Sequence, residues 1–435
     1  MSPVSRKRKP KKPKRTAKPQ ALPGAVVGTP PRHRTGAFAV FNPTPFHEPW
    51  FDAESKALVE SAEQEWESWY DEDLPGLEDR ASRAVGTVLL RHWKADHSSG
   101  NTFNPWLGHL AKAAANRAIA LIRAGDDTWR GPACLLLGLG ANRPSGLKAQ
   151  ADTAVSKLRK ALDGHGWPEA FSRLAAERTE ATGKAWIAVD GYGDRFGLVI
   201  QTATGIDEEE HYYLVAVEMA SDNTATFAGS YSSLDVAFAR WREHVGLSAA
   251  RAEPKPVTSG RDLWFLMYLT DPGDITYDLN MGPVLLEYFR AQRRLEDLVA
   301  LFRGRGLEIP APVGLYRQDL EPDFEPFMDW LTERGWDEDA VGDRVFTLMN
   351  EWYDGTPPET VHAISPLRVA ARSLTTLDVY DMGEDFKALM TEWIRYCAAR
   401  TGLDGTLTEA AVAAVPADRD EAKKVDRSFE PPEED

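Results

Sequence analysis

Apolar side chains recur every three to four residues over much of the chain before residue 184, which is the spacing of one buried face of an α-helix. One such stripe consists of Leu58, Ala62, Trp66 and Trp69. Asp52, and Asn104 followed by Pro105, are residue types typical of helix starts. We therefore expect a helical domain over residues 37–183.

The pattern changes at Lys184, where short runs of β-branched and aromatic residues replace the helical spacing. The runs are AWIAV, FGLVIQTA, HYYLVAVEM and TATFAGSY, and the segments DGYGD, TGIDEEE and ASDN separate them. They predict an antiparallel sheet of three or four strands. The polar start from Ser232 to Asp235 and the apolar stripe after it predict a helix on that sheet. Residues 184–248 should thus form a small unit of their own.

Residues 249–260, AARAEPKPVTSG, are typical of a linker. Helical spacing returns over residues 261–415, which predicts a second helical domain. Its clearest stripe, ended by Gly402, consists of Phe386, Leu389, Met390, Trp393, Ile394 and Cys397. An acidic, flexible tail is expected over residues 416–435. The predicted fold class is α+β and predominantly helical, with helical N-terminal and C-terminal units around a small antiparallel sheet with one packed helix.

Charge divides the chain into two unlike parts. It has 51 basic and 67 acidic residues in 435, but residues 1–36 hold eleven basic side chains and no carboxylate. Lys and Arg alternate there with Pro, a composition that predicts a disordered tail. Each cationic side chain that neutralises a phosphate releases a counterion, so the tail is expected to contact nucleic acid in a salt-sensitive way. The expected contact residues are Arg6, Lys7, Arg8, Lys9, Lys11, Lys12, Lys14, Arg15 and Lys18.

Two other interpretations of the tail stay open. It could bind nothing and only aid solubility, or it could dock on residues 50–80, where eleven acids face only Lys56 and Arg80. No apolar run reaches the roughly 20 residues of a membrane span, and ALPGAVVG after the basic start is too short and interrupted for export. We expect a cytoplasmic protein without membrane contact.

Motifs for cofactor, metal or nucleotide chemistry are weak. CLLLGLGANRPSG resembles the start of a dinucleotide loop, but Arg143 holds the third glycine position, so a loop between two helices is favoured. His92, Asp96, His97 and His109 lack the HExxH pattern and a clear third or fourth convergent ligand. With two Cys there is no thiolate zinc cluster, and GxSxG and GxxxxGK are absent. We predict no cofactor and no metal.

DGYGD places Asp190 and Asp194 at the two ends of a turn, and His211 follows an acidic run. Two neighbouring carboxylates could carry out acid and base chemistry if one were buried. The same residue types also suit a tight turn, which we favour. A hydrolase-type site requires the three side chains to converge in a pocket, whereas a scaffold role predicts that they point to water.

Most of the 14 Trp residues fall on apolar stripes and belong to predicted cores. Trp50 and Trp106 stand beside prolines in predicted loops, so they are the candidates for an exposed contact with a protein partner.

The segments DGYGDRFGLVIQ, HYYLVAVEM and LDVAFARW resemble part of a family of uncharacterised proteins from high-GC Gram-positive bacteria. The resemblance covers residues 184–245 and implies a domain boundary and a bacterial cytoplasmic setting. Where the family pattern suggests an Asp-His pair, this chain has Glu218, Met219 and Ala220, so no polar pair is transferred.

These patterns favour a non-enzymatic binding or regulatory protein whose tail contacts nucleic acid or another polyanion. A hydrolase-type enzyme with a carboxylate and His site around the sheet is one alternative. An assembly partner in a larger protein complex is the other.

Overall fold

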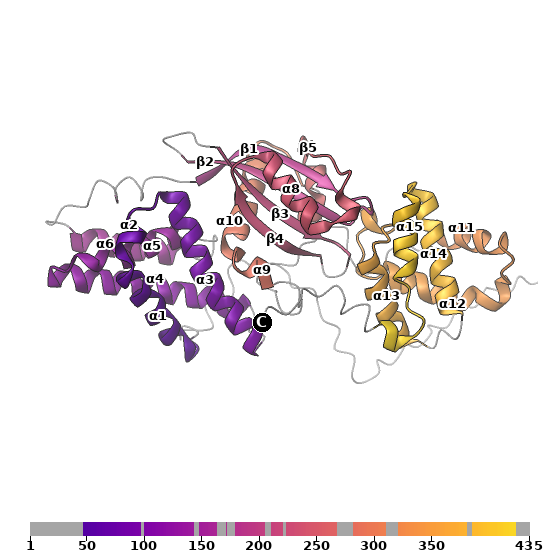
Figure 1. Ribbon diagram of the computed structural model, residues 1–435, viewed down its shortest axis with the longest axis horizontal. Helices are drawn as coiled ribbons and strands as arrows, with labels where there is room; N and C mark the ends of the chain where they lie inside the picture. Colours follow the sequence, from indigo (N-terminus) through magenta and orange to yellow (C-terminus); the bar gives the residue numbers. More distant parts are fainter. Residues whose placement is uncertain are drawn as a thin grey trace, which may run out of the picture. The chain divides into compact units, whose positions relative to one another are not determined.

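The computed structural model describes residues 47–96, 100–142, 148–162, 171, 179–204, 210–220, 223–267, 282–309, 321–380 and 385–422. Helices predominate, and the strands form one small antiparallel sheet (Figure 1). The predicted α+β, predominantly helical fold class is therefore confirmed. Within the described ranges, no helix combines the length and apolar character needed to cross a membrane.

The N-terminal helices pack around α5 (Arg130–Ala141), which contacts most of the others. The others are α1 (Trp50–Gln64), α2 (Trp66–Tyr70), α3 (Leu74–Asp96), α4 (Gly100–Ala124) and α6 (Lys148–Leu162). A Cβ at Gly138 would lie 2.5 Å from the carbonyl oxygen of Leu77, so this glycine allows α5 to approach α3 closely. Most of CLLLGLGANRPSG therefore belongs to a buried helix, which corrects the predicted loop.

The five-stranded sheet has the order β4-β3-β2-β1-β5, with antiparallel neighbours. Its strands are β1 (Thr179–Val189), β2 (Arg195–Thr204), β3 (Glu210–Glu218), β4 (Thr224–Tyr231) and β5 (Lys255–Pro256). The sheet begins at Thr179, five residues before the position expected from the sequence. β5 lies in the segment expected to be a linker, because Lys255 and Pro256 pair with β1.

Both faces of the sheet are covered. Helix α8 (Leu234–Val245) packs on one face, where Phe238 and Trp241 meet Val199 and Leu214. The helix begins in the predicted polar segment, where Ser233 caps it by accepting a hydrogen bond from the backbone N–H of Val236. The opposite face belongs to a larger core shared with the N-terminal helices, α9 (Gly282–Leu285) and α10 (Tyr288–Gly304). This core spans both boundaries expected from the sequence, near residue 183 and at residues 249–260.

A separate apolar core lies among the C-terminal helices. These are α11 (Glu321–Thr332), α12 (Glu338–Tyr353), α13 (Pro366–Val379), α14 (Phe386–Thr401) and α15 (Gly405–Ala413). Cys397 is buried in it, as expected for a core thiol. Gly402 ends α14 in the left-handed conformation, with φ of 67°, which also agrees with the prediction.

Candidate functional site

The segment DGYGD forms the tight turn between β1 and β2. The backbone N–H of Asp190 donates to the carbonyl of Arg195, and Gly193, with φ of 86°, donates to Asp190. The turn is buried against other elements: the N–H of Gly191 donates to the carbonyl of Ser248, and the Tyr192 hydroxyl donates to that of Leu407. The predicted turn is present, and it connects the sheet to the C-terminal helices.

Neither carboxylate of this turn points to water. Asp190 is 6 % exposed, and its Oδ1 accepts hydrogen bonds from the N–H groups of Gly193 and Arg195. Asp194 is fully buried and accepts a 2.6 Å hydrogen bond from the Ser365 hydroxyl. Burial, followed by the nearby charge of Asp194, raises the pKa of Asp190 to about 6.

Arg368 supplies positive charge to this turn from helix α13. Its Nε lies 3.7 Å from Asp194 Oδ2, and its two terminal nitrogens donate to the carbonyls of Thr360 and Met219. The guanidinium is 1 % exposed, and burial lowers its pKa to about 10. Ser365 and Arg368 thus join the β1–β2 turn to α13.

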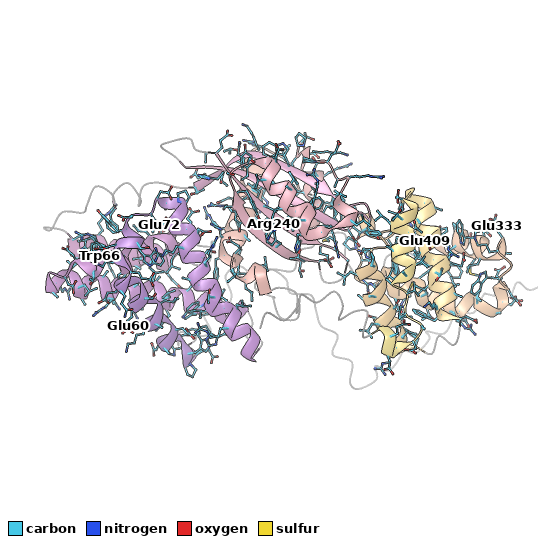
Figure 2. All side chains as sticks on the ribbon, in the orientation of Figure 1. Glu60, Trp66, Glu72, Arg240, Glu333 and Glu409 are labelled. Carbon is cyan, nitrogen blue, oxygen red and sulfur yellow. The ribbon has the colours of Figure 1, made fainter. Side chains whose placement is uncertain are left out.

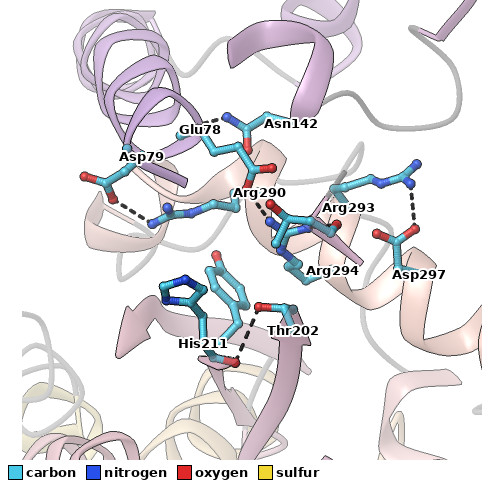
Figure 3. A network of polar contacts seen from close by, with 12 residues as sticks. Glu78, Asp79, Asn142, Thr202, His211, Arg290, Arg293, Arg294 and Asp297 are labelled. Atoms are coloured by element: carbon cyan, nitrogen blue, oxygen red, sulfur yellow. Dashed lines mark hydrogen bonds and ion pairs between the residues drawn. The ribbon is translucent and has the colours of Figure 1, made fainter. Parts of the chain in front are cut away.

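His211 does not reach these carboxylates. It pairs with Thr202 across β2 and β3, whereas Arg195, next to Asp194, pairs with Glu218. The two pairs are seven residues apart along β2, or about 23 Å. Figure 3 shows His211 beside Thr202, whose hydroxyl donates to the His211 carbonyl. The structure therefore brings together two members of the predicted hydrolase site and leaves the third at the other end of the sheet.

A second buried ionic cluster lies between α3 and α10 (Figure 3). Arg290 donates from Nε and Nη2 to the two oxygens of Glu287, and Nη2 also donates to Asp79 at 2.9 Å. Arg294 donates to Glu78 and, at 2.9 Å, to the carbonyl of Thr179. The sequence analysis did not identify this cluster, because the partners of Arg290 and Arg294 on α3 lie more than 200 positions away in the chain.

The two tryptophans proposed for partner contact are not exposed loop residues. Trp106 has no exposed surface, and its indole N–H donates to the Ser55 hydroxyl. The expectation failed because Pro105 lies inside α4 instead of starting it, which places Trp106 on the buried face of a continuous helix. Trp50 is half-buried and stacks on His92, with 4.1 Å between ring centroids.

The histidines considered for a metal separate into two environments. His92 lies 3.1 Å from Glu54, while His109 lies 2.9 Å from Asp52. His47 also faces Asp52, at 3.5 Å, so two imidazoles and one carboxylate come together. The side chain of Asp96 and residue His97 lie outside the described part of the structure. The sequence analysis missed His47 as a potential ligand because it is 62 positions from His109 and forms no recognisable motif with it.

Another polar cluster surrounds Asp323 at the start of α11. Its carboxylate accepts hydrogen bonds from the Tyr353 and Tyr396 hydroxyls and lies 2.9 Å from His362 Nε2. Burial raises the pKa of Asp323, but these hydrogen bonds outweigh it and lower the pKa to about 2. The carboxylate is therefore a stable anion that connects α11, α12 and α14.

The basic residues from Arg6 to Lys18 lie outside the described part of the chain. The acidic segment proposed as their alternative docking surface is described, and it includes Glu60 and Glu72, labelled in Figure 2. Several of its carboxylates already have cationic neighbours, such as Glu63 with Arg117 and Glu54 with Arg91. The net negative charge available to a docked tail is thus smaller than the sequence count suggests.

No protein-family model matches the chain, and comparisons with curated proteins and with solved structures give no match either.

Proposed function

We propose that this chain is a non-enzymatic cytoplasmic binding or regulatory protein that contacts nucleic acid through its basic N-terminal segment. The observation that carries the proposal is the separation of charge along the sequence. Residues 1–36 hold eleven basic and no acidic side chains, and the rest of the chain has 40 basic against 67 acidic residues. A net acidic body repels a polyanion, so attraction has to come from the basic segment.

The expectation that a scaffold role exposes Asp190 and Asp194 to water is wrong, since both are buried, but the described body does not complete a hydrolase-type site either. The two carboxylates with the strongest sequence signal for catalysis, Asp190 and Asp194, hold the β1–β2 turn and its contact to α13. His211 lies at the other end of β2, so a hydrolase-type site around the sheet lacks its third group. Trp106, one of the two residues proposed for an assembly interface, is buried. These placements favour the binding hypothesis over both alternatives.

The test compares the full chain with a chain that begins at residue 37. Binding to labelled duplex DNA and single-stranded RNA is measured at several salt concentrations between about 50 and 200 mM. The full chain should bind with a logarithmic salt slope of up to about −8 on duplex DNA if all nine predicted contacts neutralise a phosphate. The shortened chain should lose most of the affinity and most of the slope, with little change in melting temperature.

Two full-length variants control for tail length. Replacing the nine basic residues from Arg6 to Lys18 by Gln should abolish binding, while a shuffled order of residues 1–36 should preserve it, because the attraction is independent of sequence. Equal affinity and salt slope in the full and shortened chains would refute the proposal. A partner captured from native lysate that survives both nuclease and removal of the tail would instead support the assembly alternative.

A further inference from the structure

Two imidazoles and one carboxylate meet where the chain enters α1. His47 precedes this helix, Asp52 lies in its first turn, and His109 comes from the neighbouring α4 (Figure 1). His109 Nε2 lies 2.9 Å from Asp52 Oδ1, and His47 Nε2 lies 3.5 Å from Asp52 Oδ2. One ligand atom from each of the three residues lies within 4.8 Å of the other two. The three potential ligands thus converge on one point from two helices.

The two imidazole rings pack against the side chain of Phe51. Phe51 is fully buried, and its ring centroid lies 5.4 Å from that of His47 and 6.2 Å from that of His109. The imidazoles meet edge to face, with centroids 5.2 Å apart and planes at 72°. Contact with this buried ring restricts the orientations open to both imidazoles.

An ordinary ion pair does not require this arrangement. One carboxylate balances at most one positive charge, whereas two imidazole nitrogens face Asp52 here. Two imidazoles and one carboxylate are instead a set of ligand types found at zinc and other transition-metal sites.

We propose that His47, Asp52 and His109 bind one divalent transition-metal ion of the zinc class, with the remaining coordination position open to water. Metal bonds of about 2.1 Å in tetrahedral geometry place ligand atoms about 3.4 Å apart. Nε2 of His109 and Nε2 of His47 lie 2.9 and 3.5 Å from different oxygens of Asp52, and one ligand atom from each residue lies within 4.8 Å of the other two, so the side chains have to rearrange around a bound ion to reach that value. Imidazole nitrogens favour zinc, nickel, copper or iron, whereas magnesium and calcium prefer sites made of oxygen ligands.

Such an ion would connect the segment before α1 to α4. The three ligands are far apart in sequence and converge only in the folded chain, so binding should favour the folded state. A melting temperature that rises with metal is therefore a second signature, independent of any activity of the protein.

The test is a zinc titration of the metal-free full chain, made without a histidine tag, in competition with a chromogenic chelator. We expect one tight equivalent per chain and an increase in melting temperature. His47→Ala, Asp52→Asn and His109→Ala should each weaken binding at least tenfold and remove the thermal shift. His92→Gln is the matched control, because His92 also contacts α1 but faces Glu54. The His92→Gln variant should bind zinc as tightly as the unmodified chain does.

Circular dichroism and denaturation of the metal-free variants check that each one folds. If His109→Ala is unfolded, His47→Ala decides, since the His47 side chain is 43 % exposed and precedes the helix. The proposal fails if zinc shows no saturable equivalent, if the folded variants bind as tightly as the unmodified chain, or if His92→Gln weakens binding equally. An equal thermal shift with magnesium would overturn the assignment to a transition metal.

Discussion

Two buried ionic clusters in this protein use the same residue types in different ways. The helix cluster consists of Glu78, Asp79, Glu287, Arg290 and Arg294, and it joins α3 to α10. The hairpin cluster consists of Asp190, Asp194, Arg195 and Arg368, and it joins the β1–β2 turn to α13. Both lie between segments that are distant in sequence, and both contain an arginine with almost no exposed surface.

The two clusters differ in how fully their polar atoms are bonded. In the helix cluster, Arg290 makes bidentate hydrogen bonds to the carboxylate of Glu287 and a further hydrogen bond to Asp79. In the hairpin cluster, Asp194 Oδ1 and Arg368 Nε have no hydrogen-bond partner among the described residues. A buried charge is costly unless its remaining hydrogen-bonding capacity is used, so the hairpin cluster should be the weaker of the two.

The pKa shifts of the two buried arginines follow this difference. Burial lowers the pKa of both guanidinium groups. For Arg290 the neighbouring Tyr213, Glu287 and Asp79 outweigh burial, and the pKa is raised. For Arg368 burial dominates over Asp194, and the pKa falls to about 10. The lesson is that the geometry around a buried charge decides its energy, and residue type alone does not.

Removing Arg294 should give the largest effect. Arg294→Met leaves the buried Glu78 carboxylate without its cation, which should lower the free energy of unfolding by about 3–5 kcal/mol. Urea denaturation measures the loss. The double variant Glu78→Gln with Arg294→Met should recover more than half of it, because no charge then stays buried. A loss below about 1 kcal/mol in the single variant would contradict the interpretation of the helix cluster.

Removing Arg368 tests the hairpin cluster in the same way and should cost less. Arg368→Met deprives Asp194 of its neighbouring cation and the carbonyls of Thr360 and Met219 of a donor. The charged guanidinium is already destabilised by burial, so we expect a loss of about 2 kcal/mol in the same denaturation experiment. A loss larger than that of Arg294→Met would reverse the proposed order of the two clusters.

Neutralising Asp190 should stabilise the protein. Its pKa of about 6 in the folded state lies above the ordinary value of 3.8, so the folded state binds more protons between these pH values. The free energy of unfolding therefore falls as pH rises from about 4 to 6, and the penalty persists above 6. Asp190→Asn keeps an oxygen acceptor for Gly193 and Arg195 and should add about 2 kcal/mol at pH 7.5.

Denaturation of Asp190→Asn at several pH values provides an internal control. At pH 3.5 the carboxyl is protonated in both folded and unfolded states, so the variant and the unmodified chain should differ little. If Asp190→Asn raises the free energy of unfolding equally at all pH values, or lowers it at pH 7.5, the charge of the Asp190 carboxylate is not what destabilises the unmodified protein.

An exposed ion pair gives the smallest expected effect. Arg344 and Asp385 lie 2.5 Å apart, with side chains 38 % and 56 % exposed. Water and salt screen such a pair, so Arg344→Gln should change the free energy of unfolding by less than about 0.5 kcal/mol in urea denaturation. A change comparable to that of Arg368→Met would show that burial is not what separates strong from weak pairs in this protein.

Local features were predicted well from the sequence. The polar start of α8, the glycine that ends α14 at position 402 and the tight turn DGYGD follow from the preferences of a few adjacent residues. The buried stripe that includes Cys397 follows from helical spacing. In each case the signal lies within about one or two helical turns, and the same residues also determine the backbone there.

The candidate sites were predicted less well. The sequence indicated that Asp190 and Asp194 lie close together, because one turn holds both, but it could not show that Ser365 and Arg368 cover them. It considered His109 only as a distant addition to His92, Asp96 and His97, whereas packing of α4 against α1 puts His109 beside Asp52 and His47. Trp106 was expected in a loop because it stands beside a proline, but α4 continues through Pro105.

The sequence by itself therefore determined the fold class, the type of many local elements and several of the residues at which they begin or end. It also determined the separation of charge between the first 36 residues and the rest. Tertiary structure alone decided that Lys255 and Pro256 become a fifth strand, since a strand this short exists only through its pairing with β1. It also decided which buried charges meet, as with Glu78 and Arg294, 216 positions apart. Such contacts form only when distant elements pack together, and no local pattern specifies which elements those are.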